Sequence, residues 1–373
     1  SAFTSITAAI GPVIGGWLIE HATWRAAFFL NVPIAVVVLL IVFWRVPESR
    51  GDTIDRIDLA GAVLATAGLG SLIYGLIESS GEGWGSVPVV ASLSAGVILL
   101  TAFVLVETRS KHPMLPLALF KSLNFSGANL LTLLLYAPLT GGLFFFPLNL
   151  IQVQKYSATQ SGAALLPFIL LMFLLSRWSG GLVTRYGARL PLTVGPLIAA
   201  VGFCLFTIPS VGVNYWSGFL PAVLVLGLGM AISVAPLTTT VMSAVEPEQS
   251  GIASGVNNAV SRTAGVLAIA VFGVVMLWVF SGALERRLSD VPISSELRQT
   301  LMSQRVRLAG IEPPGDVQPE ARLLVEDAIA RSFVRGFRAV MFAAAGSAAL
   351  SGVFAYMMIE GRGGRRRGEW ETR

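Results

Sequence analysis

The stretch Gly11-Pro12-Val13-Ile14-Gly15-Gly16 lies in the first apolar segment of the chain. After a polar break, Trp24-Arg25 opens a second segment that contains Asn31-Val32-Pro33. Gly11 and Gly15 are four residues apart and share one helix face, where the missing side chains allow another helix to approach closely. Pro12 removes a backbone donor and bends the helix, which a membrane span tolerates when neighbours satisfy the freed groups. The stretch therefore predicts a bent, tightly packed helix near a membrane face.

The composition of the 373 residues is that of a membrane protein. Apolar residues make up 54% of the chain, charged residues only 13%, and the mean hydropathy is +0.74. Soluble domains carry about 25% charged residues. The single cysteine, Cys204, excludes an internal disulfide, and the two histidines are far apart in the sequence. We therefore expect no metal site and no cofactor.

Ten apolar stretches approach the length of about 20 residues that a membrane-spanning helix needs. No alternation with the period of a strand competes with them. The sequence therefore predicts an all-α polytopic membrane protein with about ten transmembrane helices. The ten stretches are 1–20, 24–44, 58–78, 87–107, 124–151, 160–183, 190–209, 217–241, 250–281 and 336–359.

The distribution of lysine and arginine predicts the orientation. If residue 1 lies inside and the spans alternate, the short outer segments hold only Arg25 and Lys155. The short inner segments then hold Arg45, Arg50, Arg56, Arg109, Lys111, Lys121, Arg185, Arg189, Arg262, Arg362, Arg365, Arg366, Arg367 and Arg373. Inner segments of membrane proteins are enriched in basic residues. We expect a multi-pass protein of the cell (inner) membrane with a cytoplasmic C-terminus.

Two spans carry polar stripes. Asn129, Thr132, Tyr136 and Thr140 recur on one face of the fifth span. The ninth span repeats this geometry with Ser250, Ser254, Asn257 and Ser261, and Asn258 and Arg262 are adjacent. Two explanations stay open: the stripes line a wet cavity, or they form hydrogen bonds between helices. The candidate cavity-lining residues are Asn129, Thr132, Tyr136, Thr140, Asn257 and Asn258.

A short basic turn, Gly180-Gly181-Leu182-Val183-Thr184-Arg185-Tyr186-Gly187-Ala188-Arg189, joins the sixth and seventh spans. Gly187 permits a tight reversal. Arg185 and Arg189 can meet carbonyls at helix C-termini or anionic lipid head groups. By itself the turn is typical of an inner loop that only sets topology.

The string GPVIGG, followed by WR and NVP, resembles the antiporter signature on the fifth helix of drug:proton antiporters in the major facilitator superfamily. The turn after Gly180 is similar to the family's loop motif Gly-x-Leu-x-Asp-Arg-x-Gly-x-Arg, although Thr184 replaces the aspartate. Residues 58–107 resemble the extra helix pair of the fourteen-helix branch. The resemblance implies four further helices before this chain. It also implies a signature site of Gly11, Pro12, Gly15 and Gly16 and a gating loop of Gly180, Arg185, Gly187 and Arg189.

The resemblance divides the chain into four parts. Residues 1–50 are the last two helices of the N-terminal half, and 51–110 are an inserted transmembrane hairpin. Residues 111–360 are the C-terminal six-helix half, with an outer loop at 282–335 in which 294–308 and 320–333 have helical periodicity. Residues 361–373 are a basic cytoplasmic tail.

The resemblance implies proton-coupled efflux of amphipathic drugs by alternating access, with a small-molecule substrate, protons and the lipid bilayer as partners. No Asp or Glu lies in the middle of any span, and the resemblance implies that the coupling acid and its partner arginine can reside on the first and fourth helices. The chain has no Walker A or catalytic motif, so we expect no ATP and no enzyme activity. The basic tail is a membrane anchor and not a nucleic-acid site, and we expect the full-length protein to be a monomer. The alternatives are a carrier specific for one metabolite or lipid, and a membrane fragment that does not transport by itself.

Overall fold

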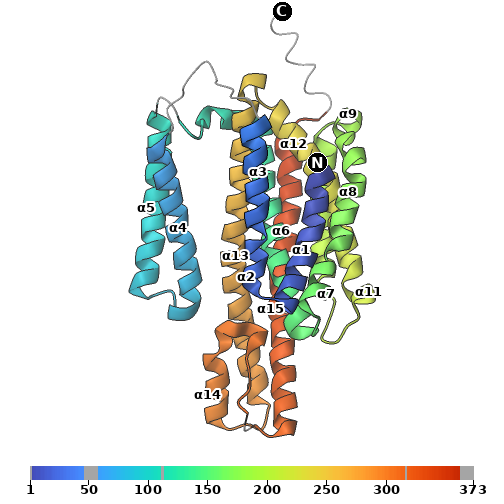
Figure 1. Cartoon of the computed structure of the whole chain (residues 1–373). Coiled ribbons are helices and arrows are strands. Elements are labelled where there is room, and N and C mark those ends of the chain that lie inside the picture. The colour runs from blue at the N-terminus through green and yellow to red at the C-terminus, as the bar shows by residue number, and fades with distance from the viewer. Residues whose placement is uncertain (1, 46–57, 111–112, 316, 362–373) are drawn as a thin grey trace, which may run out of the picture.

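The computed structural model describes residues 2–45, 58–110, 113–315 and 317–361, without the side chains of 2–9, Ser80 and Glu248. Within these ranges every regular element is helical (Figure 1). The longer helices are α1 (Ala2–His21), α3 (Asn31–Arg45), α4 (Leu59–Glu82), α5 (Val87–Arg109), α6 (Leu123–Leu148), α8 (Leu166–Gly180), α10 (Arg189–Leu205), α12 (Leu220–Ser243), α13 (Ser250–Ser289) and α15 (Pro319–Met358). The shorter ones are α2 (Trp24–Phe29), η1 (Leu117–Lys121), η2 (Asn149–Val153), α7 (Ala158–Ala163), α9 (Leu182–Tyr186), α11 (Tyr215–Gly218), η3 (Pro247–Gln249), α14 (Ser295–Ser303) and η4 (Arg305–Gly310).

A helix lies at each of the ten predicted spans. In the described ranges, eight helices or helix pairs are long and apolar enough to cross a membrane, and α10 is a shorter apolar helix. The second span combines α2 with α3, and the sixth combines α7 with α8. The prediction of an all-α polytopic membrane protein is confirmed.

Polar side chains fix the starts of several helices. Asp58 accepts a hydrogen bond of 2.7 Å from the Gly61 N–H at the start of α4. Ser157 and Gln160 form a reciprocal capping box at α7, with hydrogen bonds of 3.2 and 3.1 Å. Such caps satisfy backbone donors that have no partner within the helix.

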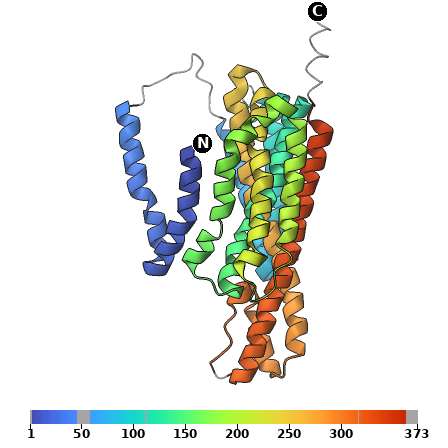
Figure 2. The same ribbon diagram turned by 90° about the vertical axis from the view of Figure 1, so that its right-hand side faces the viewer.

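Helices α6, α8, α10, α12, α13 and α15 pack into one bundle. The α4–α5 hairpin stands beside this bundle and touches it mainly through α13 (Figure 1). Helix α1 packs against α7 and α8 from another side (Figure 2). The turn at α9 lies at one end of the bundle, and α7, α11 and α14 lie at the other (Figure 1). Segments predicted for the same membrane side therefore lie at the same end.

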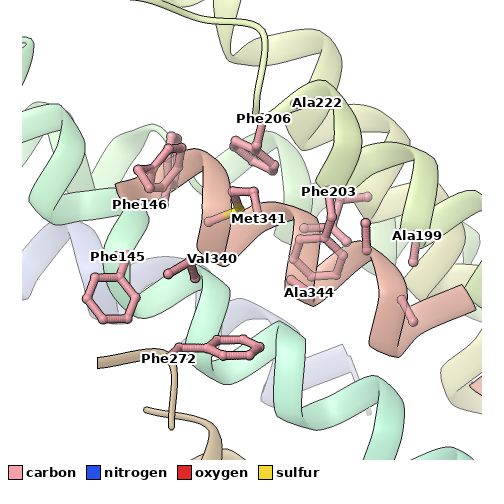
Figure 3. Close-up of a cluster of buried hydrophobic side chains, with 14 of the residues drawn as sticks. Phe145, Phe146, Ala199, Phe203, Phe206, Ala222, Phe272, Val340, Met341 and Ala344 are labelled. Carbon is pink, nitrogen blue, oxygen red and sulfur yellow. The ribbon is translucent and has the colours of Figure 1, made fainter. Parts of the chain in front are cut away.

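Aromatic side chains fill the centre of the bundle. Phe146 of α6 lies against Phe206, with ring centroids 5.0 Å apart, and both are buried. Figure 3 shows Met341 of α15 between these rings and Phe203 of α10. In a bilayer, such close contacts hold helices together because lipid tails are as apolar as the side chains they replace.

The segment 282–335, predicted as an outer loop with helical segments, is more helical than the sequence indicates. Helix α13 continues to Ser289, and α15 begins at Pro319. The predicted helical segments at 294–308 and 320–333 are confirmed, but the second is continuous with the last span. Two 40-residue helices extend past the bundle (Figure 1) because their apolar faces bury Leu284, Ile329 and Phe333.

Candidate functional site

The glycine-rich stretch at residues 11–16 forms a backbone-to-backbone contact between α1 and α7. Gly16 is buried, and a Cβ atom added there would lie 2.5 Å from the carbonyl oxygen of Ala158. A Cβ atom added to Gly162 would overlap the carbonyl group of Pro12. Only glycine allows two helices to approach so closely. The contact lies at the lower end of α1 in Figure 2, where it meets the green α7.

A polar contact lies next to this glycine contact. The Oε2 atom of Glu20 accepts hydrogen bonds from the backbone N–H of Thr159, at 3.3 Å, and from its hydroxyl group, at 2.5 Å. Glu20 is exposed. The helix pair is therefore closed by steric fit at Gly16 and by a charge-assisted pair of hydrogen bonds one turn further on.

Among the described residues the close approach is made by Pro12 and Gly16, and an approach at Gly11 and Gly15 stays a prediction. An added Cβ at Gly11 or Gly15 would meet no atom of the described chain within 4 Å. Pro12 and Gly16 are also four apart, so they share a face rotated by about 100° from the predicted one. The spacing indicates a packing face, but not which of two adjacent faces meets α7.

The turn between α8 and α10 is built as the sequence indicates. Gly187 has φ = +80° and ends α9. The Nε atom of Arg189 donates to the Tyr356 carbonyl at 2.6 Å, and its guanidinium lies 4.3 Å from the centre of the Tyr356 ring. This carbonyl is one of the last in α15, so the predicted contact with a helix C-terminus is confirmed. Gly180 is exposed, and Arg185 lies 5.4 Å from the Tyr186 ring.

The two predicted polar stripes meet at three residues. The amide group of Asn257 donates to Asn129 Oδ1 at 3.2 Å and to Thr132 Oγ1 at 2.7 Å. Asn129 and Thr132 are buried and also donate to carbonyls of their own helix. These three residues therefore form a hydrogen-bonded link between α6 and α13, which was one of the two explanations left open.

The other stripe residues lie outside this link. Tyr136 is half-buried, and Asn258 is exposed. Thr140 is exposed and faces Gly265, where an added Cβ would lie 2.9 Å from its Oγ1 atom. Their role as cavity-lining residues stays a prediction.

An apolar cavity of about 830 Å³ lies between the α4–α5 hairpin and helices α6 and α13. Leu69, Phe103 and Leu133 contribute to its walls, and Asn129 and Thr263 add polar groups. Sequence reasoning missed this cavity because the hairpin carries charged residues only at the ends of its spans. The alternation of small and large residues in the hairpin does not indicate which helix will pack opposite it.

A second cavity, of about 870 Å³, lies beside α7 at the other end of the bundle. Gln154, Tyr156 and Tyr215 line part of it. The Tyr215 hydroxyl donates to the Ala164 carbonyl at 2.7 Å. Burial, with a smaller contribution from Tyr156, raises the pKa of Tyr215 to about 12. Tyr215 is therefore a neutral hydrogen-bond donor at physiological pH.

These features define a polytopic helical membrane protein in which two parts of one chain close against each other at a glycine contact. The Major Facilitator Superfamily profile matches residues 1–270, and the chain belongs to this family.

Known relatives are named for export and resistance. The chain is 28% identical over 354 residues to the tetracenomycin C resistance and export protein of Streptomyces glaucescens, covering 94% of this chain and 65% of that protein. It is 28% identical over 363 residues to the multidrug resistance protein Stp of Mycobacterium tuberculosis strain H37Rv, covering 94% and 66%. It is 34% identical over 276 residues to the cephamycin export protein CmcT of Amycolatopsis lactamdurans, covering 73% and 57%. The chain spans less than two thirds of the length of these relatives.

Proposed function

We propose that this chain is part of a secondary active transporter that exports amphipathic small molecules by alternating access while protons enter. The observation that carries the proposal is the contact of α1 with α7 at Gly16, Pro12 and Gly162. In this proposal α1 belongs to one moving half and α7 to the other. Backbone contact without intervening side chains gives a seal that small molecules cannot pass.

The proposed cycle opens and closes this seal. Outward opening separates α1 from α7 and breaks the hydrogen bonds between Glu20 and Thr159. The basic turn at Gly180, Arg185, Gly187 and Arg189 is the proposed gate at the opposite, cytoplasmic end. The excess of Lys and Arg in the segments at that end supports the placement of this turn on the cytoplasmic side of the cell membrane, together with the C-terminus.

The proposed substrate is an amphipathic compound of moderate size. The names of the relatives concern tetracenomycin C, cephamycin and multiple drugs. An apolar cavity with a few amide and hydroxyl groups, such as the one at Asn129 and Thr263, suits molecules of this kind. Tyr136, Thr140 and Asn258 are the proposed polar groups along the path. In this proposal the full-length protein acts as a monomer.

The test is efflux by the full-length protein in a drug-sensitive bacterial host. We expect cells that express it to accumulate less tetracenomycin C and less of a lipophilic cation than cells with an empty vector. A protonophore should abolish the difference. Equal accumulation with and without the protein would overturn the export proposal, and export that resists the protonophore would overturn proton coupling. Competition by one compound only would favour a specialised carrier over a multidrug exporter.

A further inference from the structure

Four arginine side chains gather around one pocket at the end of the bundle that carries α14. The pocket has a volume of about 350 Å³. Its lining residues are Ser210, Val211, Arg287, Arg331, Val334, Arg335 and Arg338. They come from the last turns of α13, the middle of α15 and the loop after α10. Helices α13 and α15 lie side by side in this region (Figure 1).

The arginines of α15 are spaced so that they share one face. Arg331, Arg335 and Arg338 stand at i, i+4 and i+7, and Arg287 of α13 completes the pocket. Like charges at this spacing repel each other and destabilise a helix. A concave group of four guanidinium ions is therefore unfavourable unless negative charge compensates it.

The protein compensates only part of this charge. The Nε atom of Arg331 lies 2.6 and 2.8 Å from the two carboxylate oxygens of Asp327. Among the four arginines this is the one ion pair within 4.0 Å in the described ranges. Arg287 and Arg335 form no hydrogen bond or ion pair with the described part of the chain. At least two guanidinium groups in the pocket are thus available to a ligand.

Arg338 is held in place and still has an unused donor. Its Nη2 atom donates to the carbonyl groups of Ile208 and Pro209, both at 3.2 Å. Its Nε atom is buried and has no hydrogen-bond partner among the described residues. A buried donor without a partner is costly, and an anion in the pocket would satisfy it.

The position of the pocket matches the surface of a membrane. Ile208 and Pro209 directly follow α10, and Arg338 lies two residues inside the last predicted span, 336–359. The predicted span therefore places the pocket at the depth where lipid phosphates lie. Guanidinium groups bind phosphate oxygens in pairs of parallel hydrogen bonds, and they are more weakly hydrated than ammonium groups.

We propose that Arg287, Arg331, Arg335 and Arg338 form a binding site for a phosphate group at the outer face of the cell membrane. The phosphate belongs either to the head group of an anionic phospholipid or to a free phosphate ion. The segment that supplies three of these arginines is nearly neutral overall, so its sequence gives no sign of the site. Asp327 orients Arg331, and the carbonyls after α10 orient Arg338.

The test measures binding of two probes to the purified full-length protein in a neutral detergent. The probes are dioctanoyl phosphatidylglycerol and inorganic phosphate, with dioctanoyl phosphatidylcholine as the zwitterionic reference. We expect at least one of the two phosphate probes to bind more tightly than the reference, with an affinity that falls as salt rises. The double variant Arg287→Gln and Arg335→Gln should weaken this binding by about tenfold or more, because it removes two charge-assisted contacts.

Control variants separate a specific site from general charge. Arg286→Gln changes an exposed arginine beside the pocket that does not line it, and it should bind like the wild type. Arg335→Lys keeps the charge and loses the paired donors, so it should bind at intermediate strength. Thermal unfolding of each variant in detergent without probe identifies misfolded samples. If the double variant is misfolded, Arg335→Lys takes its place in the comparison.

The outcomes also identify the source of the phosphate. Binding of the lipid without competition by inorganic phosphate assigns the site to a head group, and equal competition by the ion assigns it to free phosphate. The proposal is overturned if folded wild-type protein binds neither probe. It is also overturned if the double variant and Arg286→Gln weaken binding to the same extent, or if the double variant binds like the wild type.

Discussion

Glu20 and Thr159 are 139 residues apart in the chain, and one carboxylate oxygen of Glu20 accepts two hydrogen bonds from Thr159. One donor is a backbone N–H and the other is a hydroxyl, so a substitution can remove the second and leave the first. Both residues lie at the end of the α1–α7 contact. The pair therefore offers a direct way to measure how firmly the two helices are closed.

Thr159→Val should loosen this closure to a modest degree. The variant loses the 2.5 Å hydroxyl contact, but the backbone bond and the glycine contact remain. The measurement is the rate at which a maleimide reagent labels a cysteine introduced at Ala158, in a Cys204→Ser background. We expect labelling to rise by about two- to fivefold, since exposed charged pairs contribute little.

The control for this prediction is Thr207→Val. Thr207 is a threonine after α10 whose hydroxyl donates only to the Cys204 carbonyl of its own helix end. It should leave the labelling rate unchanged. An equal rate in the Thr159 variant and the wild type would show that the hydroxyl does not hold α1 against α7.

Gly16→Leu should block closure and efflux more strongly than Gly15→Leu. A Cβ atom at Gly16 meets the Ala158 carbonyl oxygen at 2.5 Å, whereas a Cβ atom at Gly15 meets no atom of the described chain within 4 Å. Overpacking a tight contact costs about 1–3 kcal/mol, which shifts an equilibrium by roughly 5- to 150-fold. Efflux by each full-length variant, normalised to the amount inserted in the membrane, is the measurement. A greater loss of efflux in the Gly15 variant would show that the helix face predicted by the motif, and not the face with Gly16, makes the functional contact.

Asn257→Ala should lower stability more than Asn258→Ala does. Asn257 uses both amide hydrogens to bind Asn129 and Thr132, whereas the adjacent Asn258 is exposed. Interhelical hydrogen bonds in membranes contribute roughly 0.6–1.7 kcal/mol. We expect a lower melting temperature for the first variant in detergent and an unchanged one for the second. If both variants melt like the wild type but lose efflux, the stripe lines the substrate path instead.

Residue patterns predict the spans of this chain well because hydropathy acts along a single helix. The apolar runs at 87–107 and 24–44 need no partner to be identified, and helices α5 and α2–α3 lie there. The contacts between helices are harder to predict from sequence, because they depend on the rotation of each helix about its axis. Gly15 and Gly16 differ by a rotation of about 100°, and the rotation decides which of the two cannot carry a side chain in the contact with α7.

The outer segment shows a second limit. Its balanced charges and the Pro313-Pro314-Gly315 break predict a loop with short helices. Helix α15 nevertheless runs unbroken from Pro319 because Val325, Ile329 and Phe333 are buried against other helices. Tertiary packing also gathers arginines that are up to 51 positions apart, Arg287 and Arg338, into one pocket. Net charge along the sequence contains no information about such clustering.

Arg189→Ala should destabilise the end of α15 near Tyr356. The variant removes the 2.6 Å hydrogen bond to the Tyr356 carbonyl and the stacking of the guanidinium on its ring. A hydrogen bond from a charged group contributes about 1.5–3 kcal/mol, so the melting temperature in detergent should fall by several degrees. Arg189→Lys should recover only part of this loss, since an ammonium group lacks the planar face that stacks on tyrosine. Arg177→Ala, which removes an exposed arginine from α8, serves as the matched control and should melt like the wild type. An unchanged melting temperature for Arg189→Ala would mean that solvent or lipid satisfies the Tyr356 carbonyl equally well, and that the turn is not fastened to α15.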